Sequence, residues 1–191
     1  PVLNPFPLIQ GDTTVIIHQL DGNVVEWPKE KFKTDEETKM SYAVDNDNQT
    51  LFLAVSVSDK NIQQKILQDG MNLYIDMKGK KKENKGIEFP AKIGEMASVQ
   101  DIRLFGFGEG DPRLQGLRAE GSANIAIAWD NSNVIHIEYN IPLKMLEDTL
   151  VDLNNKKISI GWKLKESEMP TTPSQNVTTT SRIVGVPAGT R

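Results

Sequence analysis

Hydrophobic and polar residues alternate along most of this chain, and their period of two predicts β-strands rather than helices. The longest alternating stretch spans residues 50–58. Its aliphatic face carries Leu51, Leu53, Val55 and Val57. Since Phe52 and Ala54 make the other face apolar too, we expect this strand to lie centrally in a sheet. Similar patterns predict strands at 14–20, 39–45, 71–77, 87–93, within 98–107, and at 124–129, 134–141 and 157–165.

Two short helices interrupt the predicted strands. The first is expected over 62–67, with Asn61 as its N-cap and Gly70 at its end, and the second over 143–146, after Pro142. The polar turn at 130–133 joins two strands into a hairpin. About eight to ten short strands separated by turn signals predict an all-β fold, an antiparallel two-sheet β-sandwich with one or two short helices.

The alternating pattern also predicts the domain organisation. Residues 12–166 form one β-sandwich domain, a size at which a chain buries a substantial core. Residues 1–11 contain three prolines and are predicted to be an extended lead-in. Residues 167–191 are rich in Thr, Pro and Ser and are predicted to be a tail or linker.

Composition excludes several classes of function. The formal net charge is −4, so the basic excess that nucleic-acid binding needs is lacking. The absence of cysteine excludes a disulfide framework, a thiolate metal site and a Cys nucleophile. No apolar run reaches the roughly 20 residues of a membrane span. Because the chain begins at Pro1 without Met, we expect a processed or truncated product from which an export signal was removed.

The aromatic residues suggest where a ligand could stack. Trp129 and Trp162 alternate in phase with core-facing aliphatic residues, and Trp27 is expected to pack against the sheet, so all three tryptophans are predicted to be buried. The better candidates for an exposed aromatic platform are Tyr74, Phe105 and Phe107.

Two polar clusters allow more than one interpretation. His136 and Glu138 share a strand face, which suits metal binding or acid–base chemistry, but no third ligand is visible and we favour an ordinary polar face. The run 45–49 offers oxygen ligands for calcium, but turn propensities favour an ordinary hairpin turn. No serine lies in a nucleophile elbow, and no spacing distinguishes a glycosidase pair.

A series of short motifs follows one order along residues 21–165. They are Asp21-Gly22, Glu26-Trp27-Pro28, Asn46-Asp47, Leu51–Val55, Asp59, Leu73–Asp76, Glu138–Leu143 and Ile160-Gly161-Trp162. This order resembles carbohydrate-binding module family 9 and the wider DOMON-like group of domains. The resemblance implies a sandwich of two antiparallel sheets, export from the cytoplasm and, often, a structural calcium ion. The stretch 78–90 is similar to uncharacterised exported proteins of Bacteroidetes.

Together these features predict a non-catalytic, exported binding domain of the periplasm or cell surface, lipid-anchored before truncation, that recognises a glycan or other extracellular ligand. The predicted ligand-binding residues are Tyr74, Asp76, Arg103, Phe105 and Phe107. The predicted calcium ligands, at or near strand ends where the family often holds a metal, are Asp45, Asp47, Asp59 and Asp76. The alternative is a structural or protein-interaction domain of the cell envelope without sugar binding. A haem-binding domain and an unrecognised hydrolase rank third and fourth.

Overall fold

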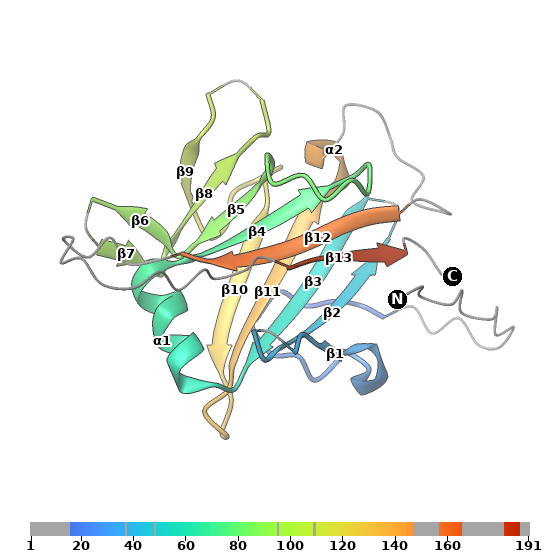
Figure 1. The fold of residues 1–191 in the computed structure, drawn as a ribbon, viewed down its shortest axis with the longest axis vertical. Helices are drawn as coiled ribbons and strands as arrows, with labels where there is room; N and C mark the ends of the chain where they lie inside the picture. Colours follow the sequence, from blue (N-terminus) through green and yellow to red (C-terminus); the bar gives the residue numbers. More distant parts are fainter. Residues whose placement is uncertain are drawn as a thin grey trace, which may run out of the picture.

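The computed structural model describes residues 16–36, 38–47, 49–94, 96–108, 110–146, 157–165 and 182–187. It confirms an all-β fold in which two antiparallel sheets stack face to face (Figure 1). Sheet A has the order β1 (Lys33–Thr34), β2 (Met40–Asn46), β3 (Thr50–Val57), β11 (Ile135–Pro142) and β10 (Asn124–Trp129). The strand predicted to be central, β3, is the middle strand of this sheet.

Sheet B has the order β13 (Arg182–Pro187), β12 (Lys157–Leu164), β4 (Met71–Asp76), β5 (Gly86–Phe89), β8 (Asp101–Phe105) and β9 (Arg113–Gly116). A separate hairpin pairs β6 (Ala91–Ile93) with β7 (Met96–Ser98). Helix α1 (Lys60–Asp69) lies near this hairpin, and α2 (Leu143–Leu146) lies at the other end of the sandwich (Figure 1). Within the described residues, no helix is long and apolar enough to cross a membrane.

The core lies between the two sheets, because one face of each strand is aliphatic and can be removed from water only against the other sheet. Its largest fully buried side chains include Tyr139, Phe89, Met40, Leu51, Leu53, Leu73 and Ile87. Tyr42 of sheet A meets Trp162 of sheet B edge-on, with ring centroids 4.7 Å apart. The predicted inward phase of Trp162 is therefore confirmed.

The segment 16–32, which we call the strap, packs on the outer face of sheet A. It includes a short 3₁₀ helix, η1 (Lys29–Lys31). Trp27 of the strap is buried against Ala43 and Ala54, two small residues of neighbouring strands. Val24, Phe32 and Phe52 extend the same cluster. Sheet A is consequently covered on both faces, as the apolar outer face of β3 predicted.

Four sequence predictions need correction. Residues 16–20 of the predicted first strand have no regular structure. Helix α1 is capped by Asp59, whose carboxylate accepts from the backbone N–H groups of Asn61 and Ile62, rather than by Asn61. The predicted tail contains β13, which pairs with β12. The predicted lead-in, residues 1–11, lies outside the described residues.

Trp129 is the fourth correction. It lies opposite Ile135 in the β10–β11 register, as its phase predicted, but it is 52% exposed. Its partner Ile135 is fully buried. Alternation therefore identified the correct face of β10, but the core does not extend over the end of this edge strand.

Candidate functional site

A buried carboxylate, Glu138 of β11, anchors the strap to sheet A. It is 2% exposed and accepts from the backbone N–H groups of Gly22 at 2.8 Å and Asp21 at 3.2 Å. Trp27 donates its indole N–H to the same carboxylate at 2.9 Å. Burial raises the pKa of Glu138, and these hydrogen bonds only partly offset the effect. The motifs around Asp21, Trp27 and Glu138 thus meet in one structural joint.

A hollow of about 390 Å³ lies beside this joint. Its lining residues are Leu20, Arg118, Ala119, Glu120, Asn124 and Asn140. Leu20 belongs to the strap, while Asn124 and Asn140 lie directly opposite each other on β10 and β11. The Arg118 guanidinium donates to the backbone carbonyl of Leu20, which ties the loop before β10 to the strap. The hollow therefore forms only where the strap, this loop and sheet A meet.

The two amides of the hollow differ in their hydrogen bonding. The Asn124 side chain accepts from the Ala119 N–H at 2.7 Å and donates to the Ser122 carbonyl at 3.2 Å. The half-buried Asn140 side chain has no hydrogen-bond partner among the described residues, although it lies in the same register row. Asn140 can therefore offer a donor and an acceptor to a bound molecule.

The charged groups of the hollow add further hydrogen-bond donors and acceptors to those of the amides. Arg118 and Glu120 are both exposed, and Arg118 keeps most of its five N–H donors beyond the one used on Leu20. An amide, a guanidinium and a carboxylate together can donate to and accept from neighbouring hydroxyls. Glycoside hydrolysis generally uses two carboxylates, and Glu120 is the only carboxylate in this lining. The arrangement suits recognition better than hydrolysis.

The structure brings two of the predicted ligand-binding residues together on the outer face of sheet B. The rings of Tyr74 and Phe105 meet edge-on, with centroids 5.7 Å apart. Phe105 also lies over Gly86, where an added Cβ would come within 2.7 Å of its ring. Tyr74 is only 9% exposed, so most of its ring face is already covered, whereas Phe105 is half-buried.

The other three predicted ligand-binding residues have internal partners. The carboxylate of Asp76 accepts from three backbone N–H groups of the loop that follows it. Arg103 donates to the Glu88 carboxylate at 2.9 Å and to the carbonyl of Lys92. Phe107 packs against the core, with the Lys85 ammonium 5.4 Å from its ring centroid. Their binding role stays a prediction.

The four predicted calcium ligands have separate roles. Asp45 lies 3.0 Å from His18 and 2.7 Å from the Lys31 ammonium; burial alone would raise its pKa, but these contacts outweigh it and lower the pKa to about 2. Asp47 accepts from two N–H groups of its own turn. Asp59 caps α1, and Asp76 holds its loop.

Consequently, these four carboxylates do not form one metal site. Within the described ranges, no three or more His, Cys, Asp or Glu side chains gather as a metal ion would require. A calcium ion held by one of these carboxylates together with other oxygen ligands stays a prediction.

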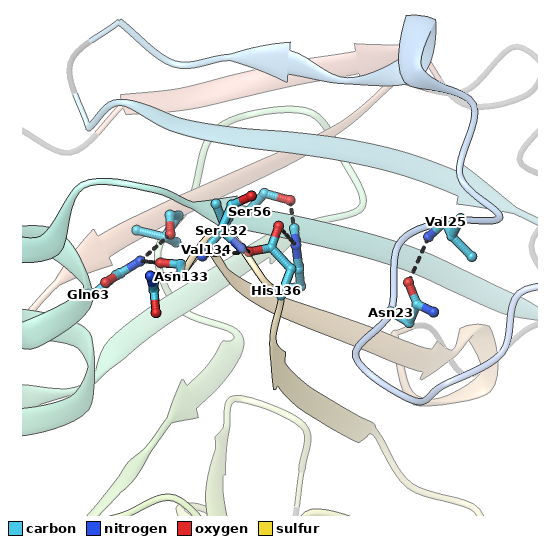
Figure 2. A network of polar contacts seen from close by, with 10 residues as sticks. Asn23, Val25, Ser56, Gln63, Ser132, Asn133, Val134 and His136 are labelled. Atoms are coloured by element: carbon cyan, nitrogen blue, oxygen red, sulfur yellow. Dashed lines mark hydrogen bonds and ion pairs between the residues drawn. The ribbon is translucent and has the colours of Figure 1, made fainter.

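A second polar network surrounds His136 (Figure 2). Its Nδ1 lies 2.8 Å from the Ser56 hydroxyl, and its Nε2 lies 3.3 Å from the Asp130 carboxylate. Asp130 also accepts from the N–H groups of Ser132 and Val134, which shapes the β10–β11 turn. These contacts make His136 a link between the turn and β3.

This serine–histidine–aspartate row lacks the surroundings of a hydrolase. Ser56 lies within β3, which pairs with β2 on one side and β11 on the other. The strand's N–H groups are therefore engaged in the ladders, and none is left to stabilise an oxyanion. We interpret the row as structural, in agreement with the polar-face interpretation of His136.

The residues of the hollow were not identified from the sequence, although one signal for them exists. The turn at 130–133 sets the hairpin register, and that register places Asn124 beside Asn140. Arg118 and Glu120 carry no comparable signal, because they lie in a glycine-rich loop whose path depends on the strap.

Comparison with known proteins gives a distant structural likeness. No family model matches the chain, and no curated protein matches it. Among solved structures, a family 9 carbohydrate-binding module from Caldicellulosiruptor kristjanssonii in complex with glucose superposes with a TM-score of 0.34 and 8% identity. The match covers 72% of this chain and 64% of that module. A likeness this loose carries no argument about the ligand, so the fold class follows from the two sheets described above.

Proposed function

We propose that this protein is a non-catalytic domain that binds carbohydrate in the hollow beside the strap. The observation that carries the proposal is the amide of Asn140, which is unpaired among the described residues and lines the same hollow as Arg118 and Glu120. Sugars present neighbouring hydroxyls that donate and accept at once, which matches this set of groups. Export to the periplasm or cell surface, and kinship with the DOMON-like group and with Bacteroidetes proteins, belong to the same proposal.

Binding in this hollow should be weak. Leu20 and Ala119 supply its apolar contact, and no aromatic ring lines it. A small polar ligand gains little beyond its loss of translational and rotational freedom, so we expect a Kd of about 1 mM. Affinity of this order suits a domain that acts beside other binding sites on a polymer.

The test is titration with neutral oligosaccharides of glucose, xylose and mannose, followed by amide NMR shifts and calorimetry. Asn140→Ala should weaken binding at least about tenfold, the range expected for a lost pair of directional hydrogen bonds. Asn131→Ala is the matched control, because Asn131 is exposed in the β10–β11 turn. Wild-type protein that binds none of these sugars, or equal binding by both variants, would refute the proposal.

The aromatic pair on sheet B is a second location for the same function. Sugar binding there would depend on Phe105, whose half-buried ring can still offer an apolar face. If Phe105→Ala abolishes sugar binding and Asn140→Ala binds as the wild type does, the binding site is on sheet B. The opposite result would assign it to the hollow.

An exposed tryptophan favours the alternative, a protein-interaction domain of the cell envelope. Trp129 is 52% exposed at the end of β10, the outermost strand of sheet A. Exposed tryptophans at edges are frequent anchors of protein contacts. Failure to bind any glycan, together with self-association that Trp129→Ala abolishes in analytical ultracentrifugation, would support this alternative.

A further inference from the structure

The strongest concentration of charge in the described structure lies in the loop after β4. Four of its five residues are lysines, Lys78, Lys80, Lys81 and Lys82, and we call residues 78–82 the basic loop. All four lysines are exposed. The whole chain carries a net charge of −4, so this cluster is a positive region on a protein that is negatively charged overall.

The basic loop has a fixed shape. The buried Asp76 carboxylate accepts from the backbone N–H groups of Lys78 at 2.9 Å, Lys80 at 2.7 Å and Lys82 at 3.1 Å. Gly79 adopts φ +63°, and an added Cβ there would lie 2.8 Å from the Lys157 carbonyl. The loop is therefore held against β12, and its side chains project from an ordered backbone.

Within the part of the chain that the structure describes, the charges of the basic loop are largely uncompensated. Among the described residues, the ammonium groups of Lys78, Lys80 and Lys81 make no hydrogen bond or ion pair. Asp76 lies beneath the loop and uses its oxygens on backbone N–H groups, although the charge of Lys82 contributes to its lowered pKa. Lys157 adds a further exposed positive charge next to Gly79. Several like charges held close together raise the local potential and attract polyanions.

We propose that the basic loop binds an acidic polysaccharide through its carboxylate or sulfate groups. Lysine ammonium groups recognise charge density rather than the planar fork geometry that arginine reads, which suits a flexible polymer with regularly spaced anions. The loop carries no exposed apolar side chain of the kind that inserts into a membrane surface. Duplex nucleic acid would need a longer basic surface than these four lysines provide.

This site is separate from the hollow, and its test is separate from that of the proposed function. Binding would be measured with polygalacturonate and chondroitin sulfate at about 50 mM salt, where lysine–anion contacts are strong. Dextran is the neutral control polymer. We expect both acidic polymers to bind and dextran not to bind, with affinity falling steeply as salt is raised.

Two triple variants with the same change of net charge decide whether the loop is responsible. Lys78→Gln/Lys80→Gln/Lys81→Gln should weaken binding of the acidic polymers at least about tenfold and reduce the salt dependence. Lys29→Gln/Lys60→Gln/Lys65→Gln removes three exposed lysines elsewhere and should change affinity less than about twofold. Unchanged thermal melting of both variants confirms that they are folded.

The outcomes separate the candidate ligands. Equal weakening by both triple variants, or no binding of either acidic polymer at low salt, would overturn the proposal. Binding to phosphatidylglycerol vesicles or duplex DNA, without binding to the acidic polysaccharides, would overturn it in favour of a membrane or nucleic-acid surface. Sugar binding in the hollow, measured with neutral oligosaccharides, is expected to be the same in all these variants.

Discussion

The outer faces of the two sheets each bury one glutamate, but they satisfy it differently. Glu138 on sheet A is 2% exposed and is held by N–H groups of the strap. Glu88 on sheet B is 5% exposed and is held by the Arg103 guanidinium at 2.9 Å and the Lys165 ammonium at 2.9 Å. The Lys92 N–H at 3.0 Å adds a third donor to Glu88.

The difference shows in the pKa values of the two carboxyls. Burial would raise both pKa values, and it does so for Glu138, whose strap donors carry no formal charge. For Glu88, the hydrogen bonds from Lys165 and Lys92 and the two positive charges outweigh burial and lower the pKa. Two buried glutamates on outer sheet faces can therefore have pKa values shifted in opposite directions. The charge of the groups that donate to each carboxylate decides the direction.

The attachment of the strap gives the largest predicted effect. Trp27→Ala removes a ring that is 3% exposed and leaves the Glu138 carboxylate with one donor fewer, so it should lower the free energy of unfolding by about 3–5 kcal/mol. Trp129→Ala, at a 52% exposed position, should lower it by less than about 1 kcal/mol. Urea denaturation followed by circular dichroism measures both. Similar losses would mean that the strap does not stabilise sheet A.

Two glycines provide the next comparison, since both have positive φ. Gly22 of the strap has φ +83°, and an added Cβ would lie 2.7 Å from the backbone nitrogen of Ala128. Gly94 has φ +63° and nothing within 4 Å of that position. Gly22→Ala should therefore cost about 2–4 kcal/mol, from strain and overlap together, and Gly94→Ala about 1–2 kcal/mol from strain alone.

Thermal and urea melts of these two alanine variants are the measurement. An equal loss would show that backbone strain alone matters and that the strap can move away from Ala128. Such movement would also open the hollow, which would appear as altered amide NMR shifts at Asn124 and Asn140.

The pH dependence of two matched variants tests the charge difference directly. A carboxyl group whose pKa is raised in the folded state contributes stability at pH values below its unfolded-state pKa. This contribution is lost as pH rises through the folded-state pKa, and Glu138 is such a group. A carboxyl group whose pKa is lowered in the folded state contributes stability at pH values above its unfolded-state pKa. This contribution is lost as pH falls through the folded-state pKa, and Glu88 is such a group. Glu138→Gln should therefore be less destabilising at pH 7 than at pH 4. Glu88→Gln should be more destabilising at pH 7 than at pH 4.

Urea melts of the wild type and both variants across this pH range give the difference in unfolding free energy between the wild type and each variant. The slope of this difference against pH reports the substituted glutamate, because contributions from all other groups cancel. Slopes of the same sign would contradict the assignment of uncharged donors to Glu138 and positively charged donors to Glu88.

The smallest effect is expected at Asp45, where the strap meets β2 through Lys31 and His18. Because the pKa of Asp45 is lowered to about 2, its ion pair stabilises the fold above about pH 4 and loses this effect as pH falls toward 2. Asp45→Asn should cost about 1 kcal/mol at pH 7, because the Lys31 ammonium is partly exposed. Acid unfolding curves check this, and a variant whose deficit persists at pH 2 would show that the contact acts through packing instead.

Alternation along the strands determined most of the fold. The faces of β3, β11 and β12 follow from their period of two, since only one side of each can be buried between the sheets. The turn at 130–133 fixed the β10–β11 register in the same local way. These features were predictable because they depend on neighbours in the sequence.

Tertiary structure alone decided what covers each face. His136, Glu138 and Asn140 share one side of β11, yet Glu138 is buried under the strap and Asn140 opens into the hollow. Trp129 has the phase of a core residue but lies where the core ends. Burial depends on segments that arrive from more than a hundred residues away, such as Trp27 on Glu138, and local periodicity carries no information about that arrival. The candidate site is therefore a product of the strap's path, while the sheets that support it were already specified by the sequence.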